Sequence, residues 1–320
     1  MDKQKFKELI CGPVTVVFTP FDEKGKNIDE NALKSNVRYL IDHGIKNGSG
    51  VLVAGGSTGD CYVMSTDERK KVFDIIVKEA NGEVPVICGC NHTSVNIIIE
   101  LAKYAESIGA DGVMVTPPYY WMNLYDDAIY ASYKAISDAI NIGIMIYNNP
   151  FIIGKDLSLD ILIRLSELEN IWALKECTTQ HIKFIKVVEN LSGRIAVING
   201  AGEWMEPISY RLGTKAFISG FANFAPEICV GIHNESMKGN FQKATEIAKK
   251  LRPLQYLLGQ YVQEIGSASQ GGRMYKEMAI LCGFKEGGPR LPIMSIPDSY
   301  REKLLKALTE GGFLRNDLLG

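Results

Sequence analysis

The chain has 320 residues and a mass of 35.4 kDa, which corresponds to about two average domains or to one large α/β barrel with an appendage. Hydrophobic residues make up 46% and charged residues 22% of the sequence, a composition that argues against a disordered or fibrous protein. The formal charge is −2, and no basic block breaks this balance, so we expect no nucleic-acid partner.

The apolar runs and the cysteines indicate where the protein works. The longest apolar runs are about nine residues, too short for a membrane helix of about 20 residues, and the first residues lack the apolar stretch of a secretory signal. The 7 cysteines are odd in number and scattered through apolar segments, which is typical of reduced core residues in a cytoplasmic protein. The 4 histidines form no ligand cluster in the sequence, so we expect no metal site.

Short apolar runs recur along the first part of the chain and predict buried parallel strands, because both faces of each run are apolar. The predicted strands are Val14–Thr19, Val51–Ala54, Val84–Cys88, Gly112–Thr116, Ile142–Tyr147, Ile171–Lys175, Ile195–Ile198 and Ala216–Ser219. Amphipathic stretches between them predict helices, for example Asp29–His43, Thr66–Ala80, Ser94–Ile108 and Tyr125–Ile140. Eight such units predict a (β/α)8 TIM barrel, and a doubly wound sheet is the alternative.

Beyond the eighth predicted strand the alternation stops and only helical periodicity remains. The predicted helices are Phe241–Leu258, Tyr261–Leu281 and Pro297–Leu308, and the glycines and prolines of Lys285–Pro292 predict a loop. We therefore expect a catalytic barrel over residues 1–233 and a C-terminal α-helical extension over residues 234–320.

A lysine and a tyrosine end two predicted strands that are neighbours in a barrel. Lys175 closes the sixth strand and Tyr147 closes the fifth, at the end of the barrel where such enzymes carry their chemistry. Lys175 is either a lysine that extends to solvent from a strand end or a buried amine that can attack a ketone. Tyr147 is either an aromatic side chain at the wet edge of the core or a phenol that passes protons to and from that amine.

Two further strand ends carry polar or aromatic groups. The glycine-rich turn Gly55–Asp60 offers backbone N–H groups and the hydroxyls of Ser57 and Thr58 to an anion, although an ordinary turn with a capping hydroxyl fits the same residues. The segment Thr116–Trp121 ends the fourth predicted strand with clustered aromatic side chains, a pattern that also suits a surface loop or a subunit contact.

Together these strand ends resemble those of the dihydrodipicolinate synthase / N-acetylneuraminate lyase family. In one-letter code the matching motifs are GSTGD, TPPYY, YNNP and LKE. The resemblance covers about 300 residues and includes the helical tail. It implies a (β/α)8 barrel, class I (Schiff-base) lyase chemistry on a 2-oxo acid without metal or organic cofactor, and a homotetramer built as a dimer of dimers.

The resemblance assigns expected roles to residues at the strand ends. Lys175 would form the Schiff base and Tyr147 would be the proton shuttle. Ser57 and Thr58 would bind the carboxylate of the pyruvyl group, and the Thr58 hydroxyl would join the proton relay.

Other expected roles follow from the same resemblance. Tyr120, or Tyr119 if the alignment shifts by one residue, would reach into the site of the neighbouring subunit. Gly200 and Ser219 would line the bound substrate.

Departures from the family patterns bear on the substrate. Dihydrodipicolinate synthases have an arginine for the semialdehyde carboxylate where this chain has Ile152, and N-acetylneuraminate lyases have a threonine where it has Cys177. N-acetylneuraminate lyases also have two acidic residues near the seventh strand, where this chain has Gly202 and Glu203. The side chains of Trp121, Ile152 and Cys177 suggest that the far end of the substrate pocket is partly apolar. Glu203 would be its polar anchor. We therefore expect an aldolase or dehydratase that acts on a pyruvate-type substrate or a 2-keto-3-deoxy sugar acid. The alternative is dihydrodipicolinate synthase or N-acetylneuraminate lyase activity itself.

Two hypotheses from other classes stay open at this point. One is a non-catalytic protein that binds a 2-oxo acid as a sensor, against which Lys175, Tyr147 and Thr58 all speak. The other is a phosphate-handling barrel in which Gly55–Asp60 cradles the phosphate.

Overall fold

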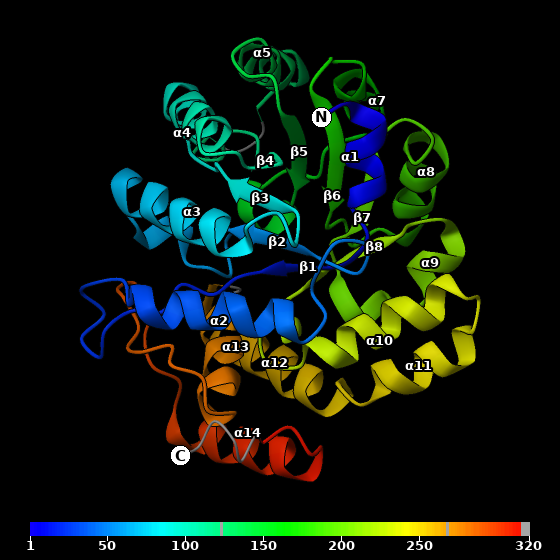
Figure 1. Ribbon diagram of the computed structural model, residues 1–320. Coiled ribbons are helices and arrows are strands. Elements are labelled where there is room, and N and C mark those ends of the chain that lie inside the picture. Colours follow the sequence, from blue (N-terminus) through cyan, green and yellow to red (C-terminus); the bar gives the residue numbers. More distant parts are fainter. Residues whose placement is uncertain (122–123, 267–268, 315–320) are drawn as a thin grey trace.

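Eight parallel strands form a closed barrel in the computed structural model, which describes residues 1–121, 124–266 and 269–314 (Figure 1). The strands follow one another in chain order around the barrel, and pairing between the last and the first closes it. The closure confirms the predicted TIM barrel and excludes the doubly wound sheet. The strands are β1 (Gly12–Val16), β2 (Val51–Ala54), β3 (Val86–Gly89), β4 (Gly112–Val115), β5 (Gly143–Asn148), β6 (Ile171–Glu176), β7 (Ala196–Asn199) and β8 (Ala216–Ser219).

Helices alternate with the strands and then continue alone toward the C-terminus (Figure 1). The α-helices are α1 (Lys3–Leu9), α2 (Glu30–Asp42), α3 (Thr66–Ala80), α4 (Val95–Ser107), α5 (Asp126–Ser137), α6 (Pro150–Ile153), α7 (Leu159–Ser166), α8 (His181–Leu191), α9 (Ile208–Leu212), α10 (Pro226–Met237), α11 (Phe241–Lys249), α12 (Arg252–Ile265), α13 (Ser269–Leu281) and α14 (Asp298–Glu310). The 3₁₀ turns of the described residues are η1 (Cys61–Val63), η2 (Gly202–Met205) and η3 (Phe221–Asn223). Within the described ranges, no helix is both long and apolar enough to cross a bilayer.

The C-terminal helices depart from the predicted ones. The prediction of one helix over Phe241–Leu258 is wrong, because two helices, α11 and α12, occupy this range. Pro253 lies in the first turn of the second helix, where proline is tolerated. The predicted helix Tyr261–Leu281 is also wrong, because α12 ends at Gly266 in the left-handed conformation, with φ of 69°. The predicted boundary between residues 233 and 234 stays a prediction, and it lies within α10.

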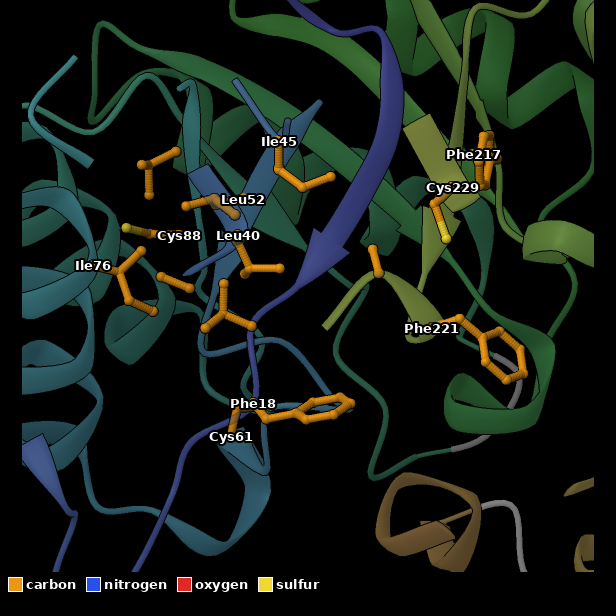
Figure 2. Close-up of a cluster of buried hydrophobic side chains, with 14 of the residues drawn as sticks. Phe18, Leu40, Ile45, Leu52, Cys61, Ile76, Cys88, Phe217, Phe221 and Cys229 are labelled. Atoms are coloured by element: carbon orange, nitrogen blue, oxygen red, sulfur yellow. The ribbon is translucent and has the colours of Figure 1, made fainter. Parts of the chain in front are cut away.

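Buried side chains form two separate hydrophobic clusters on either side of the barrel wall. The larger cluster lies between the strands and the surrounding helices, where Leu52 of β2 packs with Leu40 of α2 and Ile76 of α3 (Figure 2). The smaller cluster fills the inside of the barrel. This division follows from the alternation of side chains along each strand, which sends neighbouring residues to opposite faces.

One end of the barrel interior is closed by the first helix. Phe6 of α1 is fully buried and contacts the Trp172 ring edge to face, with centroids 5.4 Å apart. A Cβ atom at Gly112 or at Gly143 would lie 2.8 Å or 3.2 Å from the Phe6 ring, so the ring sits where β4 and β5 begin. The opposite end, where the strands finish, is the end at which barrels of this kind carry their functional sites.

Candidate active site

Lys175 and Tyr147 meet inside the barrel at the carboxyl ends of β6 and β5. The two residues are register partners on these adjacent strands, and Tyr147 belongs to the cluster that fills the barrel interior. Lys175 is only 5% exposed, and its Nζ atom lies 3.8 Å from the centroid of the Tyr147 ring. The structure thus brings together the predicted amine and phenol, with the Nζ atom over the face of the ring.

The hydroxyl of Tyr147 is held by a residue that the sequence analysis did not single out. Asn149 Nδ2 donates a hydrogen bond to this hydroxyl at 2.8 Å, and Asn149 Oδ1 accepts from the Phe151 backbone N–H at the start of α6. Asn149 therefore fixes the phenol relative to the amine. Its position two residues after Tyr147 in the YNNP motif was the available signal.

Two cavities open at the carboxyl ends of the strands, on either side of a shared wall that includes Tyr147, and Lys175 lines the first of them. They have volumes of about 650 Å³ and about 550 Å³. Both are lined by Thr58, Tyr147, Asn149 and Phe151. The first cavity holds Lys175 and most of the other predicted residues, namely Cys177, Gly200, Glu203 and Ser219. The second holds Ser57 and Ile152, together with Asn91, Thr116 and Tyr119.

The turn that carries Ser57 and Thr58 depends on its glycines. A Cβ atom at Gly59 would lie 2.5 Å from the Val17 carbonyl oxygen, and Gly55 adopts φ of 61°. The turn is closed by backbone bonds from Gly59 N to Gly56 O and from Asp60 N to Ser57 O, each 3.0 Å. These contacts place Thr58 where the two cavities meet and Ser57 in the wall of the second.

Glu203 forms the polar far wall of the first cavity. It is buried, the Ser219 hydroxyl donates to its Oε1 atom, and the Cys229 thiol lies 3.5 Å from the same oxygen. Burial raises the pKa of Glu203 to about 7, although the hydrogen bonds from Ser219 and Cys229 lower it. Glu203 can therefore accept hydrogen bonds from a ligand in this cavity and change its charge near neutral pH.

Cys177 and Gly200 form a tightly packed part of the same wall. A Cβ atom at Gly200 would lie 2.3 Å from the Cys177 sulfur, so glycine is required there. The Cys177 thiol lies 3.6 Å from the Gly200 carbonyl oxygen, and burial raises the pKa of this thiol to about 12. Cys177 is thus a neutral wall residue and not a thiolate nucleophile.

A polar network supports the strand end behind Lys175. Glu176 points to the outer face of β6, where it accepts hydrogen bonds from Asn148 Nδ2 and from the Thr178 backbone N–H, both at 2.7 Å. Asp156 accepts from Asn148 and Thr178 and pairs with Lys183. Burial raises the pKa of Glu176 to about 7. The network fixes the end of β6 and hence the direction of the neighbouring lysine.

Three aromatic residues after β4 take different positions. Tyr120 is 78% exposed and Trp121 is 75% exposed, and neither lines one of the two cavities. The expected contribution of Trp121 to the far end of the substrate pocket stays a prediction. Ile152 lies in the second cavity, apart from Cys177. Tyr119 is half-buried and lines the second cavity.

No group of three metal-ligating side chains occurs within residues 1–121, 124–266 and 269–314. The groups gathered at the barrel mouth are an amine, a phenol, hydroxyls and a carboxyl. An amine of this kind attacks carbonyl carbon and forms an imine. The fold and the site together define a class I aldolase-type lyase, a class that works through a Schiff base.

Comparisons with known proteins give the family. The model of the dihydrodipicolinate synthetase family matches residues 10–311, and the chain belongs to this family. A 4-hydroxy-tetrahydrodipicolinate synthase of Bradyrhizobium diazoefficiens is 34% identical over 98% of this chain and 99% of its own length. The enzyme of the same name from Clostridium perfringens is 32% identical over 96% of this chain and 100% of its own.

Solved structures agree with this assignment. The chloride-inhibited dihydrodipicolinate synthase of Acinetobacter baumannii in complex with pyruvate has a TM-score of 0.87 at 29% identity, over 95% of this chain and 99% of that one. The dihydrodipicolinate synthase of Aquifex aeolicus has a TM-score of 0.86 at 27% identity, over 96% and 100% of the two chains. The predicted family and its class of Schiff-base lyase are thereby confirmed.

Proposed function

We propose that Lys175 forms an imine with a 2-oxo acid. The observation that carries this proposal is the buried amine above the Tyr147 ring, facing a cavity that also holds Thr58. The uncharged form of the amine attacks the C2 ketone, the ketone oxygen leaves as water, and a cationic imine remains. This imine accepts the electron pair released when the C3–C4 bond breaks or when C3 loses a proton.

The neighbouring residues position the substrate and move its protons. Tyr147, with its hydroxyl fixed by Asn149, donates a proton to the departing hydroxyl group and takes it back in later steps. Ser57, Thr58 and the backbone N–H groups of their turn bind the substrate carboxylate, which keeps the reacting atoms aligned. Gly200 lines the bound substrate, and its lack of a side chain leaves the space that the Cys177 sulfur occupies.

The charges around the cavities favour a substrate whose far end carries hydroxyl groups. Lys175 is the single lysine or arginine among the described residues that line the two cavities. A second carboxylate would find no guanidinium at Ile152 and would meet the carboxyl of Glu203. Hydroxyl groups could instead donate to Glu203 beside Ser219. We therefore infer a 2-keto-3-deoxy sugar acid or another 4-hydroxy-2-oxo acid, with 4-hydroxy-tetrahydrodipicolinate synthesis as the alternative.

A substrate panel tests this choice. Purified protein is incubated with 2-keto-3-deoxy sugar acids, or with pyruvate and aspartate semialdehyde, and pyruvate release or consumption is followed by a coupled assay. Dehydration is followed separately through formation of the semialdehyde of a 2-oxo diacid. Turnover of a sugar acid that Lys175→Ala abolishes supports the proposal, and Lys134→Ala, on the exposed face of α5, is the matched control. Efficient turnover of aspartate semialdehyde alone would favour the alternative.

We also propose that the protein assembles as a homotetramer, a dimer of dimers, in which Tyr120 contacts the site of a second copy. The exposed aromatic side chains of Tyr120, Trp121 and Phe151 support this assembly, because large exposed apolar groups of this kind mark protein contacts. Phe151 also lines both cavities, so the aromatic surface reaches the rim of the site.

We further propose a cytoplasmic location. It is supported by the free thiols at Cys11, Cys61, Cys88, Cys90, Cys177 and Cys229.

A further inference from the structure

A buried ion pair joins the C-terminal helices to the barrel mouth. Lys276 of α13 is 2% exposed, and its Nζ atom donates to Asp60 Oδ2 at 2.5 Å and to the Thr19 carbonyl oxygen at 2.7 Å. Asp60 directly follows the turn of Ser57 and Thr58 and adopts the left-handed conformation, with φ of 62°. The left-handed conformation is uncommon for a residue other than glycine, and aspartate is one of the residues that tolerate it.

The ion pair holds the turn of Ser57 and Thr58 from two sides. On one side, the Asp60 backbone N–H donates to the Ser57 carbonyl oxygen at 3.0 Å. On the other, the Thr19 hydroxyl donates to the Gly59 carbonyl oxygen at 2.8 Å. Lys276 bonds to both Asp60 and Thr19, so one ammonium group links the two segments that enclose the turn.

Other residues of α13 approach the same place. A Cβ atom at Gly272 would lie 3.9 Å from the Thr58 Cα atom, so the helix packs directly against the turn. Tyr275 lines the first cavity and Gly272 lines the second. The C-terminal extension therefore forms part of the site wall, in addition to carrying the lysine.

Lys276 lies among buried aromatic and charged groups, where an unpaired charge is costly. Its Nζ atom lies 5.0 Å from the centroid of the Phe21 ring, and the buried carboxyl of Glu286 and guanidinium of Arg273 lie in the same charged cluster. Removing one partner of a buried pair leaves the other charge without compensation. An exposed pair such as Arg38 with Glu83 has no comparable effect, because water solvates both groups.

We propose that Lys276 is a positioning residue for the carboxylate of the substrate: through Asp60 and Thr19 it holds Ser57 and Thr58 in the place from which they bind this group. The inference rests on the proposed function, since it concerns the same 2-oxo acid site. It assigns to the C-terminal extension an indirect part in substrate binding, through the turn that carries Ser57 and Thr58. It also explains why a lysine is buried on α13, a helix far in the sequence from Asp60.

The test compares binding of a carboxylate with binding of a neutral analogue. Pyruvate and pyruvamide are incubated separately with each protein and sodium cyanoborohydride, and the rate at which the reduced adduct accumulates is followed by mass spectrometry. The variants are Lys276→Arg, Thr19→Val and the double variant Asp60→Asn with Lys276→Met, which removes both charges together. Arg38→Met is the matched control at the exposed pair.

The wild type is expected to prefer pyruvate over pyruvamide. In the double variant this preference should fall by ~10–100-fold, as expected when binding groups are displaced, with the loss in KM for the 2-oxo acid and a smaller change in kcat. Thr19→Val should lower the preference in the same direction, Lys276→Arg should retain most of it, and Arg38→Met should leave it unchanged. A general loss of packing would lower the adduct rates with pyruvate and pyruvamide equally.

The proposal is overturned if the folded double variant prefers pyruvate as strongly as the wild type does. If the double variant does not fold, Thr19→Val decides the question, because it loosens the same turn without changing a charge, and an unchanged preference overturns the proposal. Failure of the proposed function itself is distinguishable, since the wild type would then form no adduct with pyruvate at all.

Discussion

Tyr147 and Lys175 are register partners on adjacent parallel strands, and the ε-amine of the lysine lies 3.8 Å from the centroid of the phenol ring. Both side chains point into the barrel because they lie at equivalent positions of neighbouring strands, whose side chains alternate in the same phase. The hydroxyl of the same ring accepts a hydrogen bond from Asn149 Nδ2. An imine formed at Lys175 would therefore have a proton donor beside it.

Removing the Tyr147 hydroxyl should impair the chemistry more than the fold. In Tyr147→Phe the ring still packs over Lys175, and we expect kcat to fall by ~10²–10⁴-fold, the usual contribution of a positioned proton donor. Steady-state kinetics on the best substrate of the panel measure this effect. Tyr130→Phe, whose ring lies against Arg164 on the surface, is the control, and a kcat for Tyr147→Phe within twofold of the wild type would contradict the assignment.

Neutralising Glu203 should separate binding of the substrate's far end from imine formation. Glu203→Gln keeps the shape of the side chain but removes a charged acceptor, and such hydrogen bonds contribute ~1.5–3 kcal/mol. We expect KM for a 2-keto-3-deoxy sugar acid to rise by ~10–100-fold, while the rate of adduct formation with pyruvate stays near that of the wild type. Equal loss for the two compounds would show that Glu203 does not bind the far end.

Buried Glu206 should make stability depend on pH. Its Oε1 atom accepts from Asn199 and Ser209, and burial raises its pKa to about 8. Between the ordinary carboxyl pKa and about pH 8 the folded chain keeps a proton that the unfolded chain has lost, so this group lowers the free energy of unfolding as pH rises through that window. Above about pH 8 its effect is constant.

The variant Glu206→Gln removes this dependence. The free energy of unfolding of the variant relative to the wild type should increase from pH 5 to pH 8 by ~1.4 kcal/mol per unit over the steep part, measured by urea unfolding. Burial lowers the pKa of His233, so this residue changes the free energy of unfolding with the opposite sign. It is present in both proteins, so its contribution cancels in the difference and the comparison isolates Glu206. A difference that does not change with pH would refute the prediction.

Truncating the exposed aromatic side chains should weaken the proposed assembly. Tyr120→Ala removes a large exposed aromatic group beside Trp121, whose ring centroid is 5.8 Å away. We expect the dissociation constant of the dimer to rise by about 30-fold, in line with a loss of ~2 kcal/mol at an interface hot spot. Sedimentation velocity measures the change, with Met237→Ala at another exposed position as the control. Identical sedimentation of Tyr120→Ala and the wild type would exclude this surface as the contact.

Local signals explain where the sequence predicted the fold well and where it did not. The helix Thr66–Ala80 was predicted with its observed bounds, since Ser65 and Glu68 form a capping box and Asn81 ends it in the left-handed conformation. The first strand was placed at Val14–Thr19 but is Gly12–Val16, because the apolar run continues into a buried loop. Burial alone cannot distinguish these two conformations.

The site divides in the same way. Tyr147 and Lys175 could be paired from the order of the strands, because a barrel places consecutive strands side by side. The separation of Ile152 from Cys177 into two cavities could not be predicted, since it depends on where the short helix α6, which carries Ile152, lies at the barrel mouth. Nor could the ion pair of Lys276 with Asp60, whose partners are 216 residues apart and carry no local pattern.

The most direct test of the account is trapping of the imine. The protein is incubated with pyruvate and sodium cyanoborohydride, digested, and analysed by mass spectrometry to find the modified residue. The account predicts one adduct on Lys175, its loss in Lys175→Ala, and its persistence in Lys134→Ala. A wild-type protein that gains no adduct, or gains it on another lysine, would contradict the account.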